Sequence, residues 1–315
     1  MSYSRADVDT GMQFGIVPQS TSEPPRVIAP DRGMIFADRA RRFAFLAEAH
    51  SLGDWLRLLG RLTQAQHAAL QNLPLLALPD ETTLEQAHRH GMPPVPATQW
   101  PRDAAWRDIL LRIAAELKRD APDVVRKHCM QLEAATTEVL EALAEKVLRN
   151  ELHGSDVALL PYIAAALQVY WTALAAALGV KHIPVLDVPG VCPCCGSLPV
   201  ASVVRVAPEV NNLRYLHCSL CNTEWHLVRA KCAACDATGK VALRLLEGSD
   251  LPNAEAMRAE ICDDCMSYLK ILYQDKALEG DPVADDLATL ALDMLVDEAG
   301  YSRAGPNLFF VPGEH

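Results

Sequence analysis

The strongest constraint on this chain is a set of four C-x-x-C pairs within 74 residues of its carboxyl-terminal half. The pairs are separated by 22, 10 and 26 residues. Two cysteines three residues apart can curl around one ion, and two such knuckles complete a tetrahedral site with four sulfur ligands. The eight candidate ligands are Cys192 with Cys195, Cys218 with Cys221, Cys232 with Cys235, and Cys262 with Cys265. Four knuckles therefore predict two metal ions, each in a four-cysteine site. A thioredoxin-type redox dithiol is not expected, because no βαβ pattern surrounds any of the pairs.

The linker lengths favour pairing of neighbouring knuckles, the first with the second and the third with the fourth. The two long gaps leave room for a β-hairpin inside each unit, and the short gap joins one unit to the next. This arrangement predicts tandem rubredoxin-like or zinc-ribbon modules. An interleaved pairing, first with third and second with fourth, stays open. The sequence also does not choose between iron and zinc, or between a structural and a redox role.

The residue after each second cysteine should adopt a left-handed backbone, which Gly, Asn or Asp tolerates best. Gly196, Asn222 and Asp236 meet this requirement, and Met266 departs from it. In the segment "CPCC", Cys194 is left without a partner. It is expected to be a partly exposed bystander, with an auxiliary thiol that protects or exchanges with the site as the alternative.

The chain before residue 185 shows helical periodicity and no convincing strand pattern, which predicts an all-α domain. One helix is expected from just after Asp120 to about Arg149. The predicted organisation is a flexible segment over residues 1–30, an all-α helical domain over 31–186, a first rubredoxin-like module over 187–230, a second over 231–280, and a C-terminal helix with its tail over 281–315.

The segment from Val157 to Val180 runs for 24 residues without a charge, which is long enough to span a bilayer. Eight of these residues are Ala, and Pro161 and Gln168 interrupt the run. The free energy of membrane insertion is less favourable for such a segment than for a Leu-rich span. We therefore expect the buried central helix of the α domain rather than a transmembrane segment.

Charge and cysteine usage limit the possible partners and compartment. The formal net charge is −11, and residues 188–280 hold nine Lys and Arg against eleven Asp and Glu. Nucleic-acid binding relies on clustered cations, so nucleic acid is not expected as a partner. The first twenty residues contain no apolar run typical of a secretory signal. With ten cysteines, this indicates the reducing cytoplasm, where thiols bind metal more often than they form disulfides.

Other candidate groups give weaker signals. Arg39, Arg41 and Arg42 are expected to form a solvated helix face, with a docking patch as the alternative. Cys129 is expected to be a core thiol. His88 and His90 in "QAHRHG" are expected to lie in an exposed loop, with metal binding as the alternative. The chain carries no Walker loop, H-E-x-x-H or G-x-S-x-G motif. Because no catalytic constellation is evident, an enzyme is not expected.

Three blocks of sequence are similar to the signature blocks of the formate dehydrogenase accessory proteins, the FdhE family. They are "CPCCGSLP", "LHCSLCNTEWHLVRAKCAAC" and "AEICDDCMSYLKI". The helical opening "RARRFAFLA" is similar too, so the resemblance covers nearly the whole chain. It implies an all-α domain followed by two rubredoxin-like modules whose ligands are the eight paired cysteines. It also marks residues around them as packing or hydrogen-bonding neighbours of the thiolates, or as partner contacts: Glu224, Trp225, His226, Arg229, Glu260, Tyr268, Leu269 and Lys270.

The resemblance implies a cytoplasmic, chaperone-like maturation factor. Its partner would be the catalytic subunit of respiratory formate dehydrogenase, a molybdenum or tungsten iron–sulfur protein. Two alternatives remain. A redox carrier with iron bound by four sulfurs would exchange one electron with a partner, and a zinc-ribbon nucleic-acid-binding protein would need a basic surface that the charge balance opposes.

Overall fold

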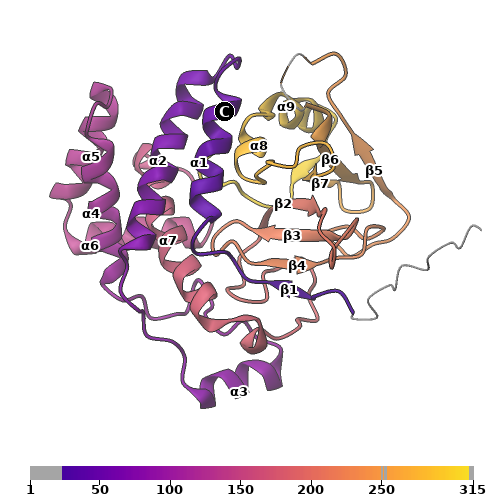
Figure 1. Ribbon diagram of the computed structural model, residues 1–315, viewed down its shortest axis with the longest axis horizontal. Coiled ribbons are helices and arrows are strands. Elements are labelled where there is room, and N and C mark those ends of the chain that lie inside the picture. Colours follow the sequence, from indigo (N-terminus) through magenta and orange to yellow (C-terminus); the bar gives the residue numbers. More distant parts are fainter. Residues whose placement is uncertain (1–22, 250, 252–253, 312–315) are drawn as a thin grey trace, which may run out of the picture.

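The structure is a computed structural model that describes residues 23–249, 251 and 254–311. Helices form the first half of the chain, and one mixed sheet with two short helices forms the second (Figure 1). The helical domain followed by a sheet region with two four-cysteine clusters confirms the predicted fold class.

Most of the segment predicted to be flexible, residues 1–22, lies outside the described residues. For Val27–Ile28 the prediction is wrong, because these residues form strand β1 and pair with β4. Backbone groups hold the segment in place. The hydroxyl of Tyr215 donates to the Pro25 carbonyl over 2.7 Å, and the His226 amide donates to the Arg26 carbonyl over 2.9 Å.

The helical domain is built around α7, whose Ala-rich surface lets α2, α4 and α6 approach closely. The buried side chains of Gln66 on α2 and Gln168 on α7 are joined by a 3.0 Å hydrogen bond. Trp171 on α7 is fully buried and donates to the Val95 carbonyl over 3.1 Å. The helices of this domain are α1 Ile35–Leu46, α2 Gly53–Gln71, α3 Glu81–His90, α4 Ala105–Leu117, α5 Asp123–Ala134, α6 Thr137–Leu148 and α7 Leu160–Leu178.

The uncharged segment expected to be the central helix lies at the centre of this domain. By length and composition, Val157–Leu178 could cross a membrane, and 83% of its most apolar window is buried inside the structure. Its neighbours in the fold are therefore other helices of the same chain.

The single helix expected between Asp120 and Arg149 is two helices, so that prediction is wrong. Ala135 adopts an extended backbone (φ −71°, ψ 143°) after α5, and α6 begins one residue after Thr136, which is also extended. The Thr136 side chain accepts a hydrogen bond from the Val139 amide, which makes it an N-cap. The apolar periodicity continues across this break, so the pattern alone does not show that a new helix begins after Thr136.

The sheet joins both predicted modules in one surface, with strand order β1-β4-β3-β2-β7-β6-β5 and β8 beside β7. Strands β2 and β7 pair in parallel, so the two modules share backbone hydrogen bonds. The strands are β1 Val27–Ile28, β2 Pro199–Val204, β3 Arg214–Cys218, β4 Glu224–His226, β5 Val241–Arg244, β6 Met257–Cys262, β7 Ser267–Tyr273 and β8 Ser302–Arg303.

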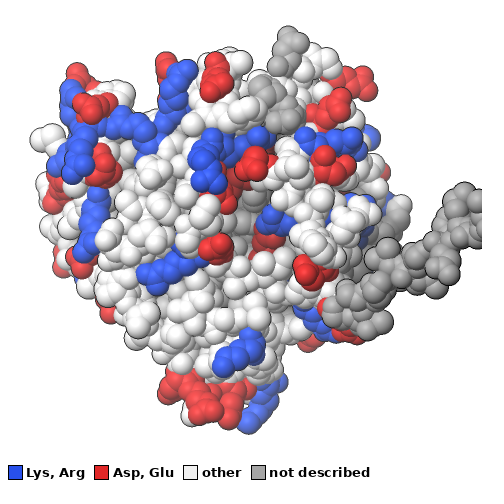
Figure 2. All heavy atoms as spheres, in the orientation of Figure 1, with Lys and Arg blue, Asp and Glu red and all other residues white. Residues whose placement is uncertain are grey.

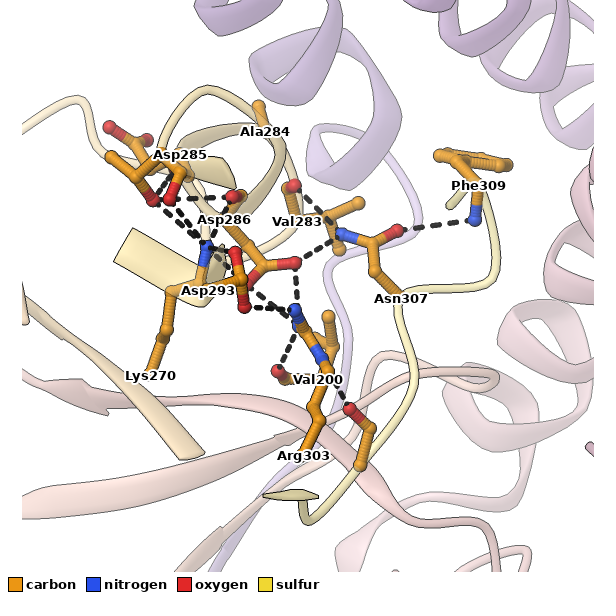
Figure 3. A network of polar contacts seen from close by, with 12 residues as sticks. Val200, Lys270, Val283, Ala284, Asp285, Asp286, Asp293, Arg303, Asn307 and Phe309 are labelled. Atoms are coloured by element: carbon orange, nitrogen blue, oxygen red, sulfur yellow. Dashed lines mark hydrogen bonds and ion pairs between the residues drawn. The ribbon is translucent and has the colours of Figure 1, made fainter. Parts of the chain in front are cut away.

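The expected C-terminal helix is present as two short helices, α8 (Ala284–Leu287) and α9 (Leu290–Glu298). At the break the backbone turns more tightly, because the amides of Thr289 and Leu292 donate to the carbonyls three residues before them, those of Asp286 and Thr289. The ammonium group of Lys270 donates to the same two carbonyls over 2.7 and 3.1 Å and so joins β7 to this turn (Figure 3).

Helix α1 is tied to α8 and to the segment just before it by buried ion pairs. Arg39 pairs with Asp281 at 3.0 Å, and Arg42 pairs with Asp285 at 2.8 Å. Both arginines are buried, so the predicted solvated face is wrong for them, while Arg41 is exposed as expected. The carboxylates that pair with the buried Arg39 and Arg42 belong to residues more than 240 positions away along the chain.

Candidate metal centres

The first centre, formed by the first and second knuckles, brings four thiols within 4.8 Å of one another: Cys192, Cys195, Cys218 and Cys221. The first knuckle precedes β2, and the second joins β3 to β4. Two contacts cross between the knuckles. The sulfur of Cys192 lies 3.5 Å from that of Cys221, and the sulfur of Cys195 lies 3.5 Å from that of Cys218.

The second centre, formed by the third and fourth knuckles, has the same arrangement with the sulfurs slightly further apart. Its candidate ligands are Cys232, Cys235, Cys262 and Cys265. The crossing contacts measure 3.7 Å between Cys232 and Cys265, and 3.8 Å between Cys235 and Cys262. Neighbouring knuckles therefore pair, as the linker lengths predicted, and the interleaved alternative is excluded.

The donor set of both centres fits a tetrahedral thiolate-bound ion. Four sulfurs at about 2.3 Å from a central ion lie about 3.8 Å from each other, close to the separations found here. Backbone amides also point at the sulfurs, as those of Leu220 and Cys221 do toward Cys218, at 3.4 and 3.3 Å. Four thiolates with these amide donors suit both zinc and iron.

All four knuckles use the left-handed turn that the sequence indicated. The residue after the second cysteine has φ 77° at Gly196, 58° at Asn222, 60° at Asp236 and 52° at Met266. The Met266 knuckle adopts this turn although its side chain disfavours it. The geometry of the ion site therefore overrides the residue's own preference.

The two centres are packed against each other through the loop that precedes the first knuckle. A Cβ atom at Gly190 would lie 2.3 Å from the carbonyl oxygen of Ala233, which belongs to the third knuckle. Only glycine allows this close approach of two backbones.

Ionisation differs between the thiols of the second centre when no ion is bound. Burial raises the pKa of Cys232 to about 12. For Cys265 burial also acts to raise the pKa, but hydrogen bonds from Ser267 and the neighbouring thiols outweigh it and lower the pKa to about 7. Without a bound ion, the thiol of Cys265 therefore loses its proton more readily than that of Cys232.

Cys194 is fully buried, so the expected partly exposed position is wrong. Its thiol lies beside those of Cys221 and Cys195 and the hydroxyl of Thr223. The carbonyl of Cys194 accepts a hydrogen bond from the Val95 amide over 3.2 Å, which fixes the first knuckle against the helical domain. Burial of Cys194 follows from that docking, which the local sequence does not reveal.

A buried polar cluster connects the first centre to the helical domain. Arg39 on α1 donates to Asn222 over 2.8 Å, and Asn222 donates to Thr172 on α7 over 2.8 Å. His217 lies 2.8 Å from Glu224 through its Nδ1 atom and 3.1 Å from Asn222 through Nε2. The knuckle residue Asn222 is therefore a junction between the metal centre and two helices. Sequence reasoning missed this role of Arg39 and His217, for which no local motif exists.

Comparisons with known proteins agree with this architecture. Family models match residues 24–187 (FdhE, N-terminal), 191–229 (FdhE, central domain) and 230–310 (FdhE, C-terminal domain). The chain is 38% identical over 291 residues to Protein FdhE of Escherichia coli O1:K1 / APEC, and equally to that of Escherichia coli O81, which covers 92% of each chain. The chain belongs to the FdhE family. The crystal structure of the FdhE protein from Pseudomonas aeruginosa matches with a TM-score of 0.80 at 39% identity, covering 92% of this chain and 100% of that one.

Membership of the FdhE family confirms the resemblance, and the structure shows where the neighbouring candidate residues lie. Glu224 accepts from Arg205 over 2.8 Å and contacts His217. Burial acts to raise the pKa of Glu224, but the Arg205 guanidinium and the hydrogen bond with His217 outweigh it and lower the pKa to about 2, so the carboxyl group is ionised. Trp225 donates to the Pro189 carbonyl over 2.7 Å, and His226 contacts Tyr215 edge-on.

The other candidate residues differ in burial and in their partners. Arg229 is exposed, Leu269 is buried in the core, and Glu260 accepts from Arg214 over 2.7 Å. Tyr268 donates to Asp293 over 2.8 Å. Among the hydrogen bonds of the described residues, none joins one of these candidate side chains to a cluster sulfur.

Lys270 belongs to a buried ionic network that holds the carboxyl-terminal segment on the sheet (Figure 3). Its ammonium group lies 3.2 Å from Asp286 and also pairs with Asp293. Arg303 bridges the same two carboxylates at 2.7 and 2.8 Å, and Asn307 donates to Asp286 over 2.8 Å. The structure thus gives Lys270 contacts that join β7, α8 and α9.

The remaining weak candidates lie apart from both centres. Cys129 is fully buried on α5, as expected for a core thiol. His88 and His90 are exposed on the last turn of α3, so the expected loop is a helix end.

Proposed function

We propose that this FdhE-family protein is a maturation factor for formate dehydrogenase that binds the catalytic subunit in the cytoplasm, and that it is not an enzyme. The observation that carries the proposal is the FdhE family match across the helical, central and C-terminal domains together with two complete four-cysteine centres. A protein that holds an immature partner needs a broad rigid surface, and metal centres that brace the sheet supply one.

The buried polar groups support a binding rather than a catalytic role. Arg39, Glu224 and Lys270 are each engaged in ion pairs or hydrogen bonds that join elements of the fold. Figure 2 shows that acidic and basic side chains are interspersed over the visible face. With a net charge of −11, this distribution favours a protein partner over a nucleic acid.

The test is an anaerobic co-purification of the tagged full chain, expressed with the formate dehydrogenase catalytic subunit from the same source. Wild-type protein should retain that subunit, and the Cys262→Ser variant should retain much less because one knuckle is lost. Cys129→Ser is the matched control, since it removes a buried thiol outside both centres. Failure of the wild-type protein to retain the subunit, with both centres filled, would contradict the proposal.

One observation favours a second function, that of a redox carrier with iron bound by four sulfurs. Cys235 and Cys265 reach the surface, so a partner could approach the second centre closely enough for electron exchange. Iron bound by four thiolates supplies one-electron redox chemistry, whereas zinc does not. Protein purified without oxygen should then absorb visible light through iron–thiolate charge transfer and bleach on reduction. A colourless protein with two zinc ions would exclude this function.

A further inference from the structure

The two centres differ sharply in their access to solvent. In the first centre, the relative exposure of Cys192, Cys195, Cys218 and Cys221 is 0–1%. In the second centre, Cys232 and Cys262 are 5% and 2% exposed, whereas Cys235 and Cys265 reach the surface. The second centre therefore has an inner and an outer side, and the first has no outer side.

The helical domain closes the first centre. The amide of Ala97 donates to the Cys195 carbonyl over 2.8 Å, from a segment that lies between α3 and α4. Gln168 on α7 donates to the Ser219 carbonyl inside the second knuckle over 2.8 Å. An ion cannot leave these four sulfurs unless the helical domain separates from the sheet.

Exposed polar groups flank the outer side of the second centre. Its knuckles are flanked by ion pairs between Lys231 and Asp236 and between Lys240 and Asp264, all partly or largely exposed. Such exposed pairs hold their elements weakly. Met266, in its disfavoured left-handed turn, is itself 45% exposed. Cys235 and Cys265 can therefore move outward without disturbing the core.

From this difference we infer that the second centre gives up its ion to a chelating ligand in solution while the helical domain and the first centre stay folded, and that the first centre does not. Incoming donor atoms would first replace Cys235 and Cys265, and then Cys232 and Cys262. A divalent ion would thereby pass from four cysteine thiolates to the ligand. Each departing cysteine takes up the proton that the ligand releases on binding, or one from the buffer, and no electron moves. The inference concerns the chain's own ligands and stands whether or not formate dehydrogenase is the partner.

The first measurement uses the full chain loaded with two zinc ions. An excess of the chromophoric chelator 4-(2-pyridylazo)resorcinol is added under native conditions, and zinc release and far-ultraviolet circular dichroism are recorded together. One equivalent should leave at least tenfold faster than the other, without loss of helical signal. Release of both ions in a single phase, whether fast or at the rate of unfolding, would overturn the inference.

The second measurement assigns the fast phase in the wild-type protein, so that it does not depend on a variant that folds. N-ethylmaleimide is added with the chelator, and alkylated cysteines are identified by mass spectrometry after each phase. The fast phase should label Cys235, Cys265, Cys232 and Cys262 and leave the first centre unlabelled. Labelling of Cys192 or Cys218 in the fast phase would reverse the assignment and overturn the inference.

Discussion

The two four-cysteine centres share ligand type, knuckle backbone and crossing contacts, yet they stand in different environments. The first lies between the helical domain and the sheet, and the second lies at the surface beside the edge strand β5. The comparison teaches that a C-x-x-C motif specifies how an ion is held, while the packing of distant elements specifies what the ion stabilises. A centre at a domain junction should support the whole fold, and a centre at an edge should support only its own module.

The largest effect is expected from loss of one ligand in each centre. Cys192→Ser should abolish cooperative folding, because a structural ion contributes about 10–16 kcal/mol and a typical domain is stable by only about 5–15 kcal/mol. Cys262→Ser should remove one ion and unfold the second module, and the helical domain should still melt cooperatively. Thermal melting by circular dichroism with a metal count tests this. If both variants lost the same amount of cooperative folding, the two centres would not differ in what they stabilise. If both variants melted like the wild type, these cysteines would not be ligands.

The next effect concerns the junction that distinguishes the first centre. Arg39→Met leaves Asp281 buried without its cation and removes a donor to Asn222. Breaking a buried pair in this way costs about 3–5 kcal/mol. Arg41→Met is the control on the same helix, where the pair with Asp38 is exposed and is worth less than about 1 kcal/mol. Urea unfolding measures both, and similar losses would show that the buried junction does not stabilise the fold.

A somewhat smaller effect is expected from Glu224, which supports the first centre through His217. Its pKa in the folded protein is about 2, below its ordinary value of 4.5. Its ionised form therefore stabilises the fold above pH 4.5, and this contribution is lost as the pH falls toward 2. Glu224→Gln should cost about 3 kcal/mol at pH 7. In urea unfolding with matched metal content, the gap to wild type should narrow below pH 4.5, and a gap independent of pH would contradict this assignment.

A modest effect is expected from the turn residues of the knuckles. Met266→Gly relieves a left-handed backbone at the second centre, worth about 1 kcal/mol, and should raise zinc affinity about fivefold. Gly196→Ala introduces the same strain at the first centre and should lower its affinity by a similar factor. Competition with a chelator of known affinity measures both. If the zinc affinity were unchanged in both variants, the backbone strain of the turn would have no effect on metal binding.

The smallest effect is expected at Cys194. Because the four other cysteines already complete the first centre, Cys194→Ser should leave the metal content at two ions per chain. Metal analysis of the purified variant checks this. Loss of one ion would place Cys194 among the ligands and displace one of its neighbours.

Much of the architecture could be predicted from local patterns. The helical domain followed from its apolar periodicity, and the pairing of neighbouring knuckles followed from the 22- and 26-residue gaps, because a hairpin needs that length. The errors have a common physical origin. Arg42 was expected in solvent because its partner Asp285 lies in a distant segment, and the α5–α6 break was missed because Thr136 interrupts no apolar position.

The sequence by itself determined which eight cysteines gather in the two four-cysteine clusters and where the left-handed turns lie, since both depend on spacing and on residues within one knuckle. Only the tertiary structure decided that one centre is enclosed and the other open. Burial of Cys194 and Asn222 arises from the segment at Val95, from α1 and from α7, all far away along the chain. Enclosure depends on which surfaces meet after folding, and a ligand motif of four residues carries no information about that.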